Sequence, residues 1–277
     1  GLAVRAAREI AGRSGASEAM LAFGLRRMIA AHKRAGLARW LAEARAEAVA
    51  PGARRRVSRL RAPALGSETV LGPEVLLQVL AGNVAGLALP AVMEALLARS
   101  AVLVQPAAEE PVTAQFFKES LDRAAPALGR AVAVAGWKGG DEEVEDGLFT
   151  DADLVVASGG EAMVRSLAPR VPGPLLLYGP RMAIGLVGGA WRDAPRAWWM
   201  RVAREIALWE QAGCLSPRVL FVAGDRRGFA LQLAGALAAR ERRWPAPPRT
   251  AAETSAVLCF RAGYEMGDGR RRGIVHV

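Results

Sequence analysis

The sequence predicts an α/β protein in which helices pack against a mostly parallel β-sheet. Three observations support this prediction. The chain has 277 residues, of which 52% are apolar, so it can bury a sizeable core. From Glu74 onward, short apolar runs alternate with helix-length segments, as in successive βαβ units. Glycine-rich and polar loops follow several of these runs, which is where a doubly wound sheet binds its ligands.

The N-terminal part is predicted to be helical. Apolar residues recur at intervals of three and four between residues 17 and 48, which is helical spacing. Pro51 and Gly52 interrupt this pattern, and we interpret the arginine-rich run at 53–61 as an exposed connection.

The rest of the chain is predicted to alternate strands and helices. The predicted strands are Val75–Leu80, Ala101–Val104, Ala131–Val134, Leu154–Ala157, Leu175–Tyr178, Ala183–Val187 and Val219–Val222. The predicted helices are Leu87–Ala98, Thr113–Ala127, Glu161–Ala168, Ala197–Ala212, Phe229–Arg240 and Ala251–Tyr264. A turn and a strand are expected at 267–277.

The formal net charge of +10 raises the question of nucleic-acid binding. The basic residues lie in separate runs at 53–61, 240–243 and 270–272, and the densest run contains no aromatic residue that would stack on a base. We therefore expect solvated basic faces and no nucleic-acid partner. Docking of a partner or of a polyanionic ligand is the alternative interpretation.

The sequence favours a cytoplasmic protein without a membrane span. Residues 75–93 contain no charged side chain, but Gln78, Asn83 and Pro90 interrupt the apolar run. A bilayer segment would have to satisfy such polar groups internally, so a buried strand, a loop and a helix are favoured. The only two cysteines, Cys214 and Cys259, are too few for a disulfide framework, which indicates a reducing compartment.

The first candidate site loop, residues 80–86, lies between a predicted strand and a predicted helix. Its glycines would let another group approach the backbone closely, and the Asn83 amide could donate to a developing oxyanion. The alternative role of Asn83 is to cap the helix that follows.

The second candidate loop consists of Ser158, Gly159, Gly160 and Glu161, again between a strand and a helix. Backbone N–H groups at the start of a helix can receive a pyrophosphate. An ordinary Ser-Gly-Gly turn is the alternative, because the loop does not match the GxGxxG pattern.

Cys214 lies between a predicted helix and a predicted strand, next to Gly213. Its thiolate could act as a nucleophile, with its own N–H in an oxyanion hole, and a buried structural cysteine is the alternative. The only histidines, His32 and His276, do not follow strands, so a Cys–His relay is disfavoured, and cysteine and histidine are too few for a zinc site. A cysteine without a histidine base suits an activated acyl group with a good leaving group, such as a thioester.

Taken in this order, the three loops resemble the acyl-CoA reductase (LuxC) family of the aldehyde dehydrogenase superfamily. The resemblance runs from about Gly72 to Gly224. Its most specific motifs are AGNV at 81–84, AVLVQP at 101–106, GGDEE at 139–143, SGGE at 158–161, YG at 178–179 and QAGCLSP at 211–217.

The resemblance implies an aldehyde-dehydrogenase-like fold with a Rossmann-like cofactor domain and an α/β catalytic lobe. It implies Cys214 as the catalytic cysteine, Asn83 as the amide that stabilises the oxyanion, and Gly159 with Gly160 in the loop that holds the cofactor's phosphates. The implied reaction is reduction of an acyl-CoA, usually a fatty acyl-CoA, to an aldehyde with NADPH. Acyl-transferring partner proteins and a homo-oligomer are further expectations.

Two positions depart from the superfamily pattern. Gln105-Pro106 stands where lysine and proline are common, and the lysine serves the adenosine ribose, so the departure bears on the preference for NADPH. We expect Gln105 and Pro106 to contact the cofactor, together with Ser158 to Glu161. Tyr178-Gly179 stands where hydrolytic members have a glutamate that activates water, and its loss suits a thioester-forming enzyme or an inactive one.

The expected domain organisation is an N-terminal helical region at 1–62, an NAD(P)-binding domain at 63–183, and an incomplete start of a catalytic domain at 184–277. Two other functions stay open at this point. One is an NAD(P)-dependent aldehyde or semialdehyde dehydrogenase acting on another activated acyl group, such as an acyl phosphate. The other is a catalytically silent scaffold of the same fold that binds a nucleotide or an acyl-carrying partner.

Overall fold

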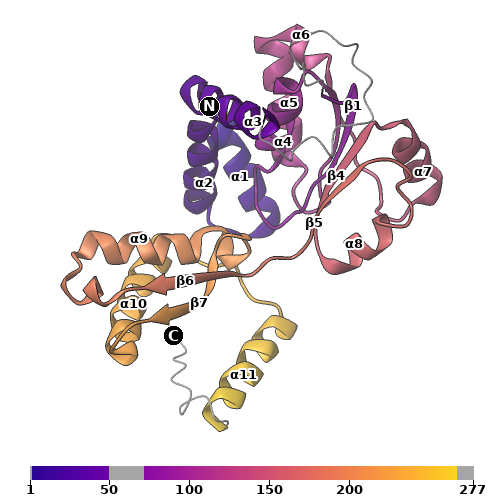
Figure 1. Ribbon diagram of the computed structural model, residues 1–277. Helices are drawn as coiled ribbons and strands as arrows, with labels where there is room; N and C mark the ends of the chain where they lie inside the picture. Colours follow the sequence, from indigo (N-terminus) through magenta and orange to yellow (C-terminus); the bar gives the residue numbers. More distant parts are fainter. Residues whose placement is uncertain (1, 50–71, 267–277) are drawn as a thin grey trace. The chain divides into compact units, whose positions relative to one another are not determined.

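The computed structural model describes residues 2–49 and 72–266 (Figure 1). The chain forms two compact units that divide at Pro180, with residues 7–24 belonging to the second unit. The arginine-rich run at 53–61 and the strand expected at 267–277 lie outside the described residues.

A five-stranded sheet forms the centre of the first unit. Its strands are β1 (Val75–Val79), β2 (Ala101–Gln105), β3 (Val132–Val134), β4 (Leu154–Ser158) and β5 (Leu175–Tyr178). They pair in the order β3-β2-β1-β4-β5, and every pair is parallel. This is the order of a doubly wound fold, in which the direction of winding changes between β1 and β4. The predicted mostly parallel α/β fold is therefore confirmed.

Helices cover both faces of this sheet, because neighbouring residues of a strand point to opposite sides. Leu76 belongs to a core cluster that includes Val92 of α4, whereas Leu77 belongs to a second cluster that includes Phe149 of α7. The helices of this layer system are α4 (Ala88–Leu97), α5 (Val112–Ala124), α6 (Pro126–Gly129), α7 (Glu142–Asp151) and α8 (Glu161–Leu167).

Two of these helices differ from the sequence-based prediction. The predicted helix at 113–127 ends at Ala124, because Pro126 excludes its predecessor from the helical region, and Ala125 has φ −149° and ψ 73°. The sequence analysis did not predict α7. Its start is defined by the Asp141 carboxylate, which accepts a hydrogen bond from Val144 N, and by an acidic first turn.

Three helices precede the sheet: α1 (Leu2–Ser14), α2 (Glu18–Ala31) and α3 (Arg34–Val49). The helical pattern at 17–48 accounts for α2 and α3, and α1 lies in the helical region expected at 1–62, although no helical spacing was identified before residue 17. Gly15, with φ +72°, separates α1 from α2.

The second unit contains a parallel pair of strands, β6 (Ala183–Val187) and β7 (Pro217–Val222). Its helices are α9 (Arg196–Ala207), α10 (Arg226–Glu241) and α11 (Ala251–Met266), with short 3-10 turns at Gly189–Asp193 and Leu208–Gln211. Side chains from α9, α10 and the first turn form its core, where Trp191 meets Trp199 and Phe229 edge-on. The opposite face of the strand pair, which bears Ile184, Leu186, Val219 and Phe221, is exposed.

The predicted helix at 197–212 is also shorter than expected. It ends at Ala207, and the next residues include three non-glycine residues with left-handed backbone: Trp209 (φ 58°), Glu210 (φ 56°) and Gln211 (φ 63°). The chain therefore changes direction just before Cys214. Within the described part of the chain, no helix combines the length and apolarity needed to cross a bilayer.

Glu145, on α7, is a buried carboxylate that organises the loop after β3. Only 3% of its surface is exposed. It accepts hydrogen bonds from the indole of Trp137 (3.2 Å) and from Gly140 N (3.2 Å), and it pairs with Arg170 at 2.6 Å. A buried carboxylate is stable only when such donors replace water, so this loop and α7 depend on one another.

We predict that Glu145→Ala lowers the free energy of unfolding by about 2–4 kcal/mol, because it leaves several donors unpaired. The matched control is Glu143→Ala, an exposed position on the same helix, which should change stability by less than about 0.5 kcal/mol. Urea unfolding of the two variants measures the difference. Equal stabilities would contradict the role assigned to Glu145.

Candidate active site

The loop after β1 lies at the C-terminal edge of the first sheet, and it contains the predicted oxyanion residue Asn83. Leu80 N donates to Gln105 O of β2 (2.9 Å), and Ala81 N donates to Ser158 Oγ of β4 (3.2 Å). The Asn83 side chain is exposed. The helix-cap alternative is wrong, because α4 begins at Ala88 and its N-cap is Leu87. Asn83 therefore lies in a loop that both neighbouring strands hold.

The far end of this loop is fixed by Gly86 and by Glu110, which the sequence analysis did not single out. Gly86 has φ +92°, and a Cβ atom there would lie 2.7 Å from Leu25 Cδ2. Glu110 is buried and accepts hydrogen bonds from Gly86 N (3.3 Å), from Thr113 N (2.9 Å) and from the Thr113 hydroxyl. One carboxylate thus ties the Asn83 loop to the start of α5. A glutamate three residues before a threonine, at the start of a predicted helix, was the available sequence signal.

The predicted phosphate loop follows β4. Ser158 Oγ accepts from Ala81 N and donates to Val79 O (3.4 Å), while Gly159 N donates to Tyr178 O (3.1 Å). These two residues therefore hold the loop in place through protein hydrogen bonds.

The other two residues of this loop lie at the surface. Gly160 is the N-cap of α8, and a Cβ atom there would have no heavy atom within 4 Å. Glu161 is exposed and pairs with Arg165 at 3.2 Å. Open space and unpaired N–H groups at the start of a helix are what an anionic group requires.

Gln105 and Pro106 are both buried at the end of β2. The Gln105 amide nitrogen donates to Trp137 O in the loop after β3 (3.3 Å). Since β1, β2 and β4 are parallel and in register at their ends, Gln105, Ser158 and the Asn83 loop share one edge of the sheet.

Cys214 occupies an exposed turn in the second unit, so the alternative of a buried structural cysteine is wrong. Ser216 N donates to Gly213 O (3.0 Å), and this bond closes a turn with Cys214 and Leu215 at its tip. Ser216 is buried, and its hydroxyl donates to Leu208 O (3.3 Å). The turn is therefore anchored at its base while the thiol faces solvent. Asn83 belongs to the first unit and Cys214 to the second, so the structure describes each of the two residues only within its own unit.

The backbone before this turn is strained. Left-handed φ at a non-glycine residue costs about 1–2 kcal/mol, and Trp209, Glu210 and Gln211 adopt it consecutively. The Trp209 ring packs on Gly24, where a Cβ atom would lie 2.4 Å from the indole. Burial raises the pKa of the Glu210 carboxyl, although part of the side chain is exposed.

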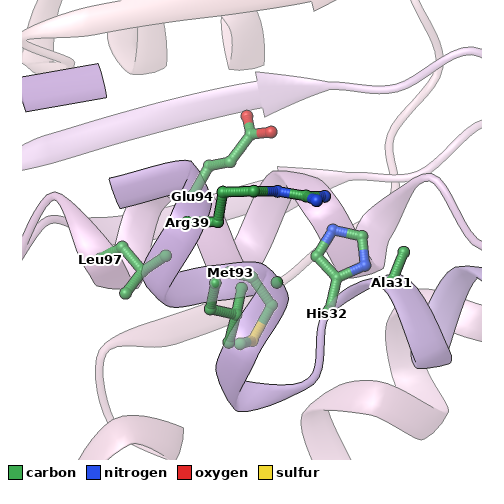
Figure 2. Close-up of a pocket in the computed structure, with 8 residues that line it drawn as sticks. Ala31, His32, Arg39, Met93, Glu94 and Leu97 are labelled. Carbon is green, nitrogen blue, oxygen red and sulfur yellow. The ribbon is translucent and has the colours of Figure 1, made fainter. Parts of the chain in front are cut away.

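A separate pocket in the first unit lies against α2, α3 and α4 (Figure 2). It is lined by Ala31, His32, Gly36, Leu37, Arg39, Met93, Glu94 and Leu97, none of which was predicted as a site residue. The His32 ring bonds Met28 O through Nδ1 (2.7 Å), so this nitrogen is protonated. Partial burial raises the pKa of the Glu94 carboxyl, although part of the residue is exposed, and the charge of His32 partly opposes that rise. Within the described ranges, no cluster of three or more histidine, cysteine or acidic residues could hold a metal ion.

We predict that Gly86→Ala lowers the free energy of unfolding by about 1–3 kcal/mol, because alanine disfavours φ +92° and its methyl group would press on Leu25. Gly147→Ala is the matched control, since Gly147 lies inside α7, has no positive φ and has open space around it. The control should be as stable as the parent or slightly more so. Thermal unfolding of both variants tests the prediction, and an unchanged Gly86→Ala protein would refute it.

A second prediction concerns the pH dependence of stability. The pKa of Glu94 is higher in the folded chain than in the unfolded chain, so the folded state binds more protons, and stability falls as pH rises from about 4.5 through the folded pKa. Glu94→Gln should flatten this part of the curve. Melting temperatures between pH 4 and 7 measure it, and parallel curves for parent and variant would contradict the assignment.

Comparisons with known proteins agree with this fold. Solved structures that the chain resembles include an aldehyde dehydrogenase from Bartonella henselae (18% identity, TM-score 0.58, 86% of this chain and 48% of that chain). Others are the His387Ala mutant of a propionaldehyde dehydrogenase from Clostridium phytofermentans (14%, 0.55, 85% and 50%) and an NADP dependent enzyme from E. coli (18%, 0.54, 85% and 47%). The chain thus spans about half the length of these structures, and the aldehyde-dehydrogenase-like fold is confirmed.

A search of curated protein sequences finds no match. The family model described as "Acyl-CoA reductase (LuxC)" matches residues 2–272, which is nearly the whole chain. This match agrees with the resemblance of the loop motifs and with the parallel sheet that positions them. The chain belongs to the acyl-CoA reductase (LuxC) family.

Proposed function

We propose that this protein reduces an acyl-CoA thioester, with a fatty acyl group, to an aldehyde through an acyl group bound to Cys214. The main support is the exposed thiol at the tip of an anchored turn, in a chain that belongs to a family of acyl-CoA reductases. A nucleophile that must meet a bulky thioester has to be accessible, and Cys214 is.

In the proposed mechanism, the Cys214 thiolate attacks the carbonyl carbon of the thioester. The oxygen then carries negative charge, which the Asn83 amide and the Cys214 N–H stabilise by hydrogen bonds. The tetrahedral species expels coenzyme A as a thiolate and leaves an acyl group on Cys214. One thiolate replaces another, so no strong base is required, which agrees with the absence of histidine from the described turn and its anchors. After hydride addition, collapse releases the aldehyde and restores the Cys214 thiolate.

A nicotinamide cofactor would supply the hydride, and we propose NADPH. The edge formed by β1, β2 and β4 fits such a group, because ligands of doubly wound sheets bind where the winding direction changes. Gly160 and the N–H of Glu161 would receive a phosphate, since the space around Gly160 is open. Ser158 and Gly159 would keep the loop in shape, and Gln105 and Pro106, although almost fully buried, would contact the cofactor at the end of β2.

Partners and location follow from the same chemistry. A cysteine that takes up acyl groups can receive them from coenzyme A or from an acyl-transferring partner protein, and we propose both sources. The thiolate must stay reduced, which suits the cytoplasm. We further propose a homo-oligomer.

The experiment that tests the function is intact-protein mass spectrometry after mixing with a long-chain acyl-CoA without cofactor. We expect one acyl adduct on the parent protein, none on Cys214→Ala, and release of the aldehyde when NADPH is added. Cys259→Ala is the matched control, because Cys259 is also a free, exposed cysteine, and its adduct should equal that of the parent.

Three outcomes would count against the proposal. An adduct that persists in Cys214→Ala would mean that another residue is acylated. A parent protein that forms no adduct, yet binds nucleotide, would favour the scaffold. An adduct from an acyl phosphate alone would favour a dehydrogenase of a different activated acyl group.

A further inference from the structure

The loop after β3 is held beside the end of β2 by buried groups. Gln105 donates its side-chain amide to Trp137 O (3.3 Å), and Ala135 N donates to Val104 O (3.1 Å). Glu145 then accepts from the Trp137 indole and from Gly140 N, both at 3.2 Å. The backbone is therefore fixed on both sides of Lys138.

Lys138 is the residue that this arrangement presents to solvent. Its side chain is exposed, and among the described residues it has no recorded ion pair. A Cβ atom on Gly139 would have no heavy atom within 4 Å, so the space next to Lys138 is open. An exposed cation thus lies on a hydrogen-bonded loop at the C-terminal edge of the sheet.

The position of this cation suits the ribose of a dinucleotide. In a sheet of order 3-2-1-4-5, the end of the second strand is where the 2′ substituent of the adenosine ribose is recognised, by a carboxylate for a hydroxyl and by a cation for a phosphate. Gln105 is the last residue of that strand, but it is buried, uncharged and bonded to Trp137. It cannot neutralise a phosphate itself, yet it holds the loop that contains Lys138.

We infer that Lys138 binds the 2′-phosphate of NADPH and sets the preference for NADPH over NADH. This inference rests on the proposed function, because it assumes that the edge binds a nicotinamide dinucleotide. Lys138 would act as a phosphate-binding cation, whereas Gln105, Trp137 and Glu145 position it.

Carboxylates near Lys138 would oppose binding of the 2′-phosphate and favour NADH over NADPH. Glu145 is paired with Arg170 and is not available to a ligand. Asp141 is exposed although it caps α7, Glu109 is exposed in the loop that follows β2, and Glu142 and Glu143 are exposed in the first turn of α7. These carboxylates would favour a ribose hydroxyl over a phosphate. The measured preference therefore reports whether Lys138 or these carboxylates dominate.

The test is direct binding of NADPH and of NADH, followed by nucleotide fluorescence, to the parent, Lys138→Ala and Lys138→Glu. Lys138→Ala should weaken NADPH binding by roughly tenfold, the value of one charge-assisted hydrogen bond, and leave NADH binding within about twofold. Lys138→Glu should reverse the preference. Lys118→Ala is the matched control, because Lys118 pairs with Asp122 within α5, away from the edge, and its variant should bind both nucleotides as the parent does.

The outcomes separate the two proposals. A parent that binds NADPH but keeps that affinity in Lys138→Ala, or loses both affinities equally, overturns the role of Lys138 and leaves the proposed function intact. A parent that prefers NADH also overturns it. A folded parent that binds neither nucleotide overturns the proposed cofactor and this inference together.

Discussion

The parallel five-stranded sheet is the constraint on which the first unit depends. Because its strands run the same way and end in register, the loops after β1, β2 and β4 must meet at one edge. Helices have to cover both faces, so Leu76 and Leu77, adjacent in sequence, serve different cores. Residues separated by almost eighty positions, such as Ala81 and Ser158, become hydrogen-bonded neighbours as a consequence. The sheet thus brings these loops together at one edge, whatever side chains the loops contain.

Buried carboxylates then fix the loops that the sheet brings together. Glu110 joins Gly86 to the start of α5, and Glu145 joins Trp137 and Gly140 to Arg170. Each carboxylate is costly to desolvate, and backbone and side-chain donors offset that cost. Glu110 holds the Asn83 loop, and Glu145 holds the loop that contains Lys138. Both loops are proposed to bind ligands, and such hydrogen bonds would fix their conformation before a ligand binds.

Much of the fold was predictable because apolar runs bounded by glycine and proline are local signals. The bounds of β5 and β6 agree with those predicted, and those of β1, β2 and β4 differ by one residue. The acidic helix α7 was missed because it has few apolar residues that would reveal a helical period, although the Asp141 cap and the acidic first turn were local signals. The premature end of α5 was predictable in principle from Pro126, since a proline excludes its predecessor from the helix.

The site was predictable in its loops but not in the roles of single residues. Sequence motifs located Asn83, the 158–161 loop and Cys214, yet Ser158 and Gly159 are held by the Asn83 loop and by the ends of β1 and β5. Likewise, the Gln105 amide donates a hydrogen bond to Trp137 O, and the pairing of β2 with β3 brings these two residues together. Such roles depend on hydrogen bonds between distant segments, about which composition and periodicity carry no information.

The turn that contains Cys214 shows how local strain and packing combine to expose a side chain. A helix continued from α9 would have included residue 212, as the apolar pattern suggested. Instead, three left-handed residues turn the chain, at an expense of about 1 kcal/mol or more each. The packing of the Trp209 ring on Gly24 offsets part of this conformational free energy. The hydrogen bond from the Ser216 hydroxyl to Leu208 O closes the base of the turn. Because only glycine at position 24 leaves room for the indole, the position of the Cys214 turn is determined partly by a glycine in a helix almost two hundred residues earlier.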